Sequence, residues 1–235
     1  MPRFDALHMR VLAIDTSWKY GTLALARGDA SGFEVLETAP LTGGAFSAQL
    51  VPQIAAVLAR RNLRKQDLDA FAAVSGPGSF TGLRVGLAAI KGLVEVLQKP
   101  IATVSGLEAL AIVSGASGRV FAALDAQRSE VFLGEYDVQS EKFAATALNP
   151  DSLHSRASLA TLPKGAVLVC SDEAVADFAR AHGVAVRRVE RPDAGLVAHV
   201  GLQKILAGHT VTADALDANY VRRSDAEIFS TPKSQ

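Results

Sequence analysis

The chain has 235 residues, of which 49% are hydrophobic and 20% are charged. This composition is typical of a folded protein and excludes an intrinsically disordered chain. Its 24 basic residues balance its 24 acidic residues, so the net charge provides no attraction for a polyanion, and this chain alone is not expected to bind nucleic acid.

The beginning of the chain differs from a targeting sequence. Residues 1–9 contain Arg3 and Asp5 but no apolar core segment. No stretch approaches the roughly 18 apolar residues that a membrane span needs. We therefore expect a cytoplasmic protein without membrane contact. Because residues 1–9 also show no periodicity, they are predicted to form a flexible tail.

Strands and helices alternate in the first half of the chain. Short apolar runs that end in polar or glycine-rich turns predict strands, and apolar residues three and four apart predict helices. The expected order is three antiparallel strands, a helix, a strand, a long helix, a strand and a short helix, at residues 10–15, 21–27, 33–38, 47–61, 69–75, 79–98, 101–104 and 107–113.

The second half starts again with antiparallel strands. A hairpin, a further strand and two helices are expected at residues 119–125, 130–138, 166–170, 172–182 and 193–207. Antiparallel strands followed by parallel βα units fit a mixed sheet with helices on its faces. The repetition predicts the duplicated α/β fold of actin-like ATPases and ribonuclease H. Its two lobes would be residues 10–105 and 106–235, and the last segment could pack back on the first lobe.

A glycine-rich turn leads directly from a strand into the long helix, in the sequence SGPGSFTGLRVGLAAIKGL at 75–93. Backbone N–H groups and the positive end of a helix can bind an anion at such a turn. The candidate anion-contacting residues are Gly76, Gly78, Ser79 and Thr81. The alternative is structural: the glycines allow the turn and Ser79 caps the helix. No lysine completes a P-loop pattern.

The long helix is apolar or small on most of its circumference, so it needs cover on two sides. Its small residues would let another helix approach closely. Together with the preceding helix it is predicted to form a docking surface for a protein partner. The candidate interface residues are Leu50, Ile54, Val57, Gly82, Val85, Gly86, Ala89 and Leu93. The alternative is that the chain's own sheet and helices cover both faces.

Asp15, Thr16 and Ser17 follow the first strand and resemble the phosphate-contacting hairpin of actin-like ATPases, in which a carboxylate holds hydrated magnesium. The alternative is that their side chains bind the neighbouring backbone. The corresponding place in the second half, residues 125–129, contains no glycine that would let phosphates approach. This difference argues against ATP chemistry by the chain alone.

Other reactive groups are sparse. The five histidines are scattered, so no metal site is expected, and no serine lies in a nucleophile-elbow pattern. The single cysteine, Cys170, lies in an apolar run and is expected to be a small buried hydrophobe. We therefore expect no catalytic residues.

Four stretches together resemble one known family: VLAIDTS at 11–17, the glycine-rich motif at 75–93, ALDAQRSEVFLGEYD at 123–137 and YVRR at 220–223. In this order they are similar to the TsaB family, also called YeaZ. The resemblance covers most of the chain and departs from the family pattern at two positions. Phe46 stands where relatives carry histidine, which puts in doubt any role of that histidine. Asn219 replaces a proline that commonly precedes the tyrosine.

The resemblance implies an actin-like scaffold that has lost catalytic power and pairs with its catalytic paralogue TsaD and the small ATPase TsaE. The implied complex transfers threonylcarbamoyl to the adenosine beside the anticodon of tRNAs that read codons beginning with A. We therefore expect tRNA contact only through the complex and no cofactor on this chain alone. ATP or ADP is expected at the assembled complex, and a homodimer when the partner is absent.

Two other functions stay open on the sequence. One is a small ATP-dependent phosphotransferase of the actin-like superfamily. The other is a plain tRNA-binding module, which the zero net charge and the lack of aromatic and basic clusters disfavour. Peptidase activity is not expected, because the sequence offers neither a nucleophile pattern nor a metal cage.

Overall fold

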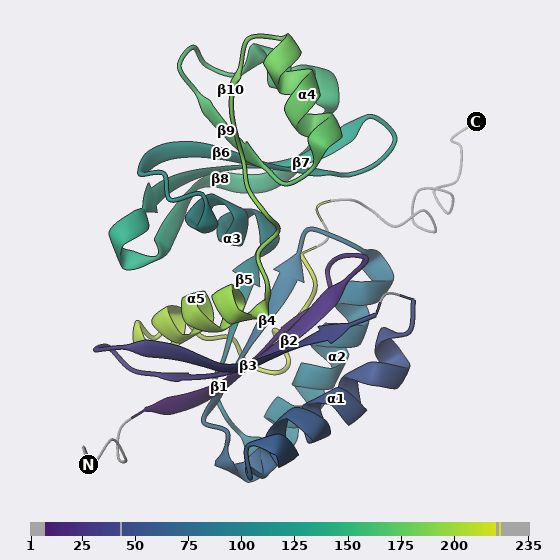
Figure 1. Ribbon diagram of the computed structural model, residues 1–235, viewed down its shortest axis with the longest axis vertical. Coiled ribbons are helices and arrows are strands. Elements are labelled where there is room, and N and C mark those ends of the chain that lie inside the picture. The colour runs from purple at the N-terminus through teal and green to yellow at the C-terminus, as the bar shows by residue number, and fades with distance from the viewer. Residues whose placement is uncertain (1–7, 43, 220, 222–235) are drawn as a thin grey trace.

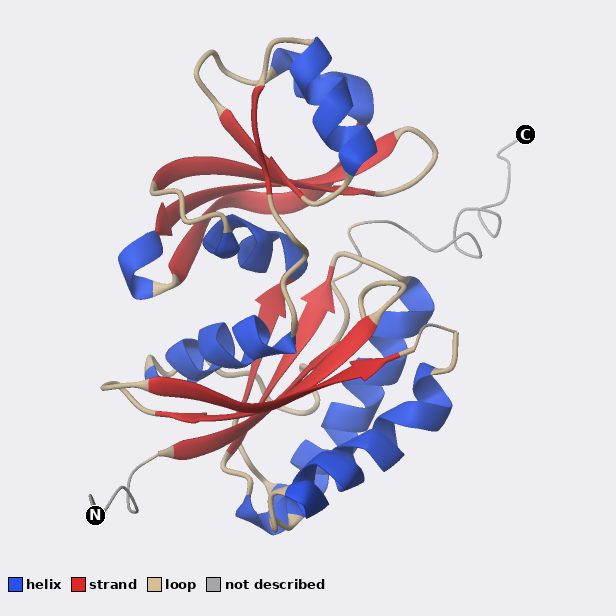
Figure 2. Ribbon diagram, viewed as in Figure 1, coloured by secondary structure: helices blue, strands red, loops and turns tan. Residues whose placement is uncertain are grey.

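Two five-stranded sheets, each flanked by helices, make up the molecule (Figure 1). The computed structural model describes residues 8–42, 44–219 and 221. The predicted tail over residues 1–7 and most of the YVRR motif lie outside the described residues. The core of each lobe lies between its sheet and the helices that cover it (Figure 2).

The first sheet has the order β3-β2-β1-β4-β5. Its strands are β1 (Met9–Asp15), β2 (Gly21–Gly28), β3 (Phe33–Leu41), β4 (Ala70–Gly76) and β5 (Ile101–Ser105). The first three are antiparallel, whereas β4 pairs in parallel with both β1 and β5. The central strands β1 and β4 are buried, which explains why the sequence shows continuous apolar runs there.

Helices cover both faces of this sheet. α1 (Phe46–Arg60) and α2 (Phe80–Leu97) pack together on one face, and α5 (Ala194–Leu206) lies on the other (Figure 1). A short 3-10 helix, η1 (Lys65–Asp67), precedes β4. Ser79 caps α2, because its hydroxyl accepts a hydrogen bond from Gly82 N at 3.3 Å. The predicted helices agree with α1 and α2 to within one residue at each end.

The second sheet repeats the first, with the order β10-β9-β6-β7-β8. Its strands are β6 (Gly118–Asp125), β7 (Glu130–Gln139), β8 (Ala144–Ser155), β9 (Val167–Cys170) and β10 (Ala185–Arg188). Helix α3 (Gly106–Val113) covers one face and α4 (Glu173–Ala181) the other, with the 3-10 helices η2 (Ser140–Lys142) and η3 (Arg156–Thr161) beside β8. In each sheet three antiparallel strands precede two parallel ones, which confirms the predicted duplicated fold.

Two strands of the second sheet were not predicted. β8 contains Asn149, Pro150 and Asp151, a sequence that reads as a turn. It forms the edge of the sheet, where proline is tolerated, and its pairing with β7 shifts register twice. β10 has only four residues and lies at the opposite edge. Edge position and short length therefore explain both omissions.

The chain returns to the first lobe after β10. α5 packs on the first sheet, and Val211 N then donates a hydrogen bond to Ile101 O at 2.9 Å. Leu216 and Ala218 are buried in the core of that lobe. The sequence reading assigned this whole segment to the second lobe and allowed only its end to return. The structure places α5 in the first lobe because that helix covers the second face of the first sheet.

The predicted tail also ends earlier than expected. Met9 belongs to β1 and pairs with Gly28, and His8 Nδ1 lies 2.6 Å from a carboxylate oxygen of Asp29. Residues 8 and 9 are therefore part of the fold.

Candidate functional site

The turn after β1 is buried, and its polar side chains form hydrogen bonds within the turn. Asp15, Thr16 and Ser17 each have at most 8% exposure. One carboxylate oxygen of Asp15 accepts hydrogen bonds from Ser17 N at 2.8 Å and from Ser17 Oγ at 2.6 Å. This is the local side-chain turn that the sequence offered as an alternative to magnesium binding.

The glycine-rich turn between β4 and α2 is filled by other parts of the same chain. Ser79 N donates to Ser17 O at 2.7 Å, and a Cβ at Gly78 would overlap that carbonyl. Gly76 has a φ of +135°, and a Cβ there would lie 2.6 Å from Asn219 O. Glycine is thus required because two segments pass close to the turn.

This packing favours the structural alternative to an anion-binding turn. The Ser79 amide and the Ser79 hydroxyl already have partners within the chain, and the Ser17 carbonyl occupies the space in front of Gly78. Thr81 is exposed on the first turn of α2. The turn joins β1, β4 and α2, and Ser17 fills the space beside Gly78.

The small residues of α2 also face the chain itself. Thr16 Oγ1 donates to Gly82 O at 2.8 Å, and a Cβ at either Gly82 or Gly86 would overlap Thr16. Leu50, Ile54 and Val57 of α1 are buried in the core of the first lobe. These five candidate interface residues are therefore covered by their own chain, and the prediction that they line a docking surface is wrong.

The outward face of the α1–α2 pair consists of other residues. Val51 is 65% exposed and Val96 is 70% exposed. The small exposed residues Ala48 and Ala55 lie one turn from Val51 on α1, and Gly92 and Ala88 lie one and two turns before Val96 on α2. We call these six residues the outer helix face. The other predicted interface residues, Val85, Ala89 and Leu93, are half-buried against the core.

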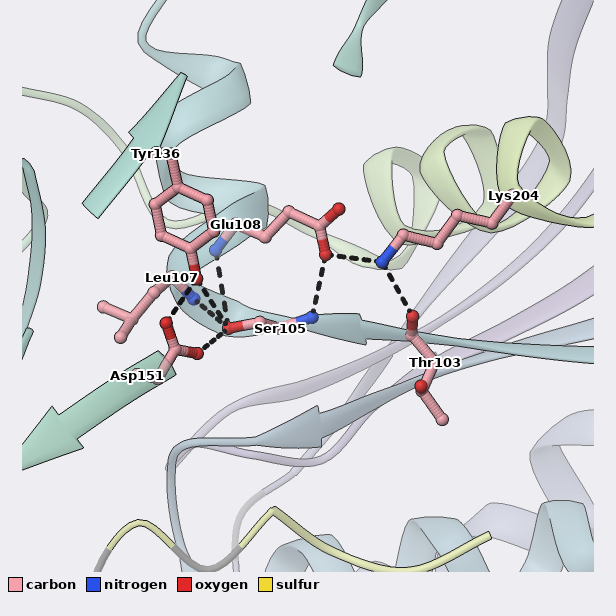
Figure 3. Close-up of polar contacts among 7 residues, drawn as sticks. All are labelled: Thr103, Ser105, Leu107, Glu108, Tyr136, Asp151 and Lys204. Atoms are coloured by element: carbon pink, nitrogen blue, oxygen red, sulfur yellow. Dashed lines mark hydrogen bonds and ion pairs between the residues drawn. The ribbon is translucent and has the colours of Figure 1, made fainter. Parts of the chain in front are cut away.

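Hydrogen bonds to Asp151 join the two lobes at the end of β5 (Figure 3). Ser105 Oγ donates to one carboxylate oxygen of Asp151 at 2.5 Å, and the Tyr136 hydroxyl donates to the other at 2.5 Å. Burial, followed by the Asp151 charge, raises the pKa of Tyr136, so this phenol stays protonated as a donor. Gly134 leaves space for the carboxylate, since a Cβ there would lie 2.5 Å from Asp151 Oδ1.

An ion pair extends this network to α5. Lys204 Nζ lies 2.6 Å from Glu108 Oε2 and 3.0 Å from Thr103 O, and the same carboxylate oxygen accepts from Ser105 N at 3.2 Å (Figure 3). Glu108 is only 7% exposed. Sequence reasoning missed this network because its members come from distant parts of the chain and form no motif.

The hairpin between β6 and β7 is held by ionic and polar contacts. Asp125 pairs with Arg156 Nη2 at 2.8 Å, and Asp125 N donates to a carboxylate oxygen of Asp172 at 3.1 Å. Gln127, Arg128 and Ser129 all have positive φ, which is unusual for residues other than glycine. The carboxylate that corresponds to Asp15 is thus engaged with an arginine of its own lobe.

Few reactive groups come together among the described residues. Within residues 8–42, 44–219 and 221, no three His, Cys, Asp or Glu side chains are grouped so that they could hold a metal ion. No helix in this part of the chain is long and apolar enough to cross a membrane. Cys170 is free and buried, as its apolar surroundings predicted.

Comparison with known proteins identifies the family. A family model described as TsaD, tRNA N6-adenosine threonylcarbamoyltransferase, matches residues 40–188, more than half of the chain. The tRNA threonylcarbamoyladenosine biosynthesis protein TsaB of Escherichia coli (strain K12) is 29% identical over 231 residues, which cover 93% of this chain and 96% of the relative. This chain belongs to the TsaB (YeaZ) family. TsaB of Bacillus subtilis (strain 168) is 35% identical over 137 residues, 56% of this chain and 57% of that relative's length.

A solved structure has the same fold as this TsaB family member. YeaZ from Pseudomonas aeruginosa superimposes with a TM-score of 0.75 at 23% sequence identity, covering 90% of this chain and 99% of that one. The likeness extends over both lobes.

Both departures from the TsaB pattern have structural consequences. Phe46 is 8% exposed, and its ring fills the space beside Gly21 and Gly82. A role assigned to a histidine at that position does not carry over, because a core residue occupies it. Asn219 N donates a hydrogen bond to Ser75 O at 2.7 Å, which a proline could not do.

Proposed function

We propose that this protein is a non-catalytic scaffold subunit in the transfer of threonylcarbamoyl to tRNA. The observation that carries the proposal is the match over nearly the full length of E. coli TsaB, named as a tRNA threonylcarbamoyladenosine biosynthesis protein. The subunit pairs with a TsaD-like catalytic paralogue, and a TsaE-like ATPase joins them. The chain contacts tRNA only through this cytoplasmic complex.

Packing around the glycine-rich turn supports a non-catalytic role. Ser17 occupies the place in front of Gly78 where the phosphates of an actin-like ATPase would approach the backbone. In the second lobe, Asp125 is paired with Arg156. We propose that the chain binds no nucleotide by itself, and that ATP or ADP enters only at the assembled complex.

The outer helix face is the surface that we assign to the partner. Val51 and Val96 are large exposed hydrophobic side chains of α1 and α2, and the small exposed residues one turn from each permit close approach of another helix. The same face can form a homodimer when the partner is absent.

The interface is tested with Val51→Glu and Val96→Glu in a pull-down with the TsaD-like subunit from the same genome. Both side chains are exposed, so each variant should keep the native melting temperature and lose the partner. Leu148→Glu is the matched control, since Leu148 is 47% exposed on the second lobe. Retained binding by both helix variants would exclude this face.

The alternative phosphotransferase function is tested with the purified chain and magnesium-ATP. We expect no turnover, and reconstitution of tRNA modification only after the TsaD-like and TsaE-like subunits are added. Turnover by the chain alone in the range of ordinary enzymes, about 1 to 1,000 per second, would contradict the scaffold assignment.

A further inference from the structure

A separate pocket opens where the loop after β1 meets the segment that follows β10. Its volume is about 440 Å³, within the range of small-molecule sites. The lining includes Trp18 from the first lobe, Ser171 and Asp172 just before α4, Arg188 at the end of β10, and Glu190 and Arg191 on the returning segment. The glycine-rich turn and the outer helix face contribute none of these residues.

Arg191 lacks the partners that a buried guanidinium normally has. Its guanidinium lies 4.0 Å from the centre of the Trp18 ring, in a cation–π contact. Its Nη1 atom is buried and has no hydrogen-bond partner. Burial lowers the pKa of Arg191, although the charges of Asp15 and Asp172 act in the opposite direction. A desolvated donor without an acceptor is costly, so a ligand in the pocket that supplied acceptor oxygens would stabilise this guanidinium once its side chain turned toward them.

Arg191 lines a second cavity as well as this outer pocket. A cavity on the inner side, lined by Asp15 and Ser17 among others, measures only about 10 Å³. That volume holds about one water molecule. Of the two, the outer pocket is the one large enough for an organic molecule.

Charges around the pocket restrict the chemistry of the ligand. Arg188 is paired through its Nε with Glu173 at 2.9 Å, whereas Nη1 of Arg191 has no partner. Asp172 and Glu190 lie on the same lining and would repel a phosphate with two negative charges. They would instead attract an ammonium group or other donors. A planar guanidinium matches a carboxylate, which can accept two parallel hydrogen bonds.

We propose that this pocket binds a small zwitterion with the chemistry of an α-amino acid. The carboxylate accepts hydrogen bonds from Arg191, and the amino group faces Asp172 and Glu190. The site goes beyond the scaffold function and is independent of pairing through the outer helix face.

Trp18 provides a direct probe, because it is the only tryptophan in the chain. The full-length protein is titrated with each of the twenty amino acids while Trp18 emission is recorded, with acetate, methylamine and inorganic phosphate as reference probes. We expect at least one amino acid to give a saturable change and to raise the melting temperature. Acetate and methylamine should act more weakly, and phosphate should have no effect.

Variants test the role assigned to Arg191. Arg191→Gln should abolish the change in Trp18 emission. Arg191→Lys should weaken amino-acid binding at least tenfold, because lysine keeps the charge but lacks the planar guanidinium with its parallel N–H donors. Arg180→Gln is the matched control, since Arg180 is exposed on α4 and does not line the pocket. A melting temperature of Arg191→Gln equal to or above that of the wild type would show that loss of binding is not loss of folding.

Several outcomes would overturn the proposal. These are no saturable response to any amino acid, an unchanged response in Arg191→Gln, or a response to phosphate that exceeds that to every amino acid. If Arg191→Gln fails to fold, the test rests on Arg191→Lys. Binding by Arg191→Lys as tight as that of the wild type would refute the role of the guanidinium.

Discussion

Gly86 and Gly92, both in α2, allow the effect of side-chain packing on stability to be compared with the effect of helix propensity. A Cβ at Gly86 would overlap Thr16 Oγ1, whereas a Cβ at Gly92 would meet nothing within 4 Å. We expect Gly86→Ala to lose about 1 to 3 kcal/mol of unfolding free energy, because overpacking forces α2 away from β1. Gly92→Ala should gain roughly 0.5 to 1 kcal/mol, because alanine favours helix.

Urea denaturation of the two variants measures this contrast. At this chain length, 1 kcal/mol corresponds to roughly 2 to 4 °C in melting temperature. Equal stability of the two variants would mean that α2 does not rest on Thr16. The surface at Gly86 would then be open to a partner after all.

Cys170 should be chemically inert in the folded protein. Burial, and then the charge of Asp172, raises the pKa of this thiol to about 11. Since the thiolate is the reactive form, alkylation by iodoacetamide at pH 8 should be much slower in the native protein than in urea. The unfolded thiol loses its proton first as the pH rises from about 9 towards 11, so this group lowers stability over that window. Equally fast alkylation in both states would contradict the buried placement.

At the scale of elements, the Glu108–Lys204 pair connects α3 to α5. Lys204→Met leaves a nearly buried carboxylate without its cation, so we expect a loss of roughly 1 to 3 kcal/mol. The double variant Glu108→Gln with Lys204→Met should recover much of that loss, because it removes the buried charge as well. A double-mutant cycle in urea measures the coupling.

An exposed ion pair provides the control for this cycle. Arg64 and Asp67 are three residues apart, and Arg64 is 79% exposed. Their coupling should be close to zero, since solvent screens such pairs. A coupling between Glu108 and Lys204 no larger than this one would show that the connection between α3 and α5 is not electrostatic.

The elements were predictable where local signals were strong. Apolar runs predicted β1 and β4, and the Ser79 cap together with helical periodicity predicted α2 to within one residue at each end. The edge strand β8 was missed because its proline reads as a turn. Contacts over long sequence distances leave no local signal, so the positions of Thr16 against Gly86 and of Lys204 against Glu108 could not be predicted.

The candidate site was likewise predictable only in part. The sequence correctly predicted the helices α1 and α2, but most of the residues proposed for the docking surface lie on their buried faces. Apolar residues at helical spacing indicate that a helix has an apolar face, but not whether the chain itself or a partner covers it. Val51 and Val96 lie outside that periodic pattern. The pocket beside Trp18 combines residues from both halves of the chain, and no motif joins them.

At the scale of the whole molecule, the second lobe is inserted between the first sheet and the helix that completes it. The chain leaves the first sheet at β5, builds the second sheet, and returns as α5 to cover the first (Figure 1). The Asp151 and Glu108 networks cross the junction between the lobes. The first lobe therefore completes its core only with the segment that follows the second lobe, and polar contacts join the two lobes.

We therefore expect the two lobes to unfold in one cooperative transition. Amide exchange of β4, in the first sheet, and of β6, in the second, should report the same opening free energy, and Trp18 emission and far-UV circular dichroism should give coincident urea midpoints. Lys204→Met combined with Asp151→Asn removes polar contacts on both sides of the junction and should split the transition, with β6 opening first because α5 still covers the first sheet. Different opening free energies for β4 and β6 in the wild type would show instead that the lobes unfold independently. The outer helix face would then belong to a lobe that moves relative to the other, and not to one rigid molecule.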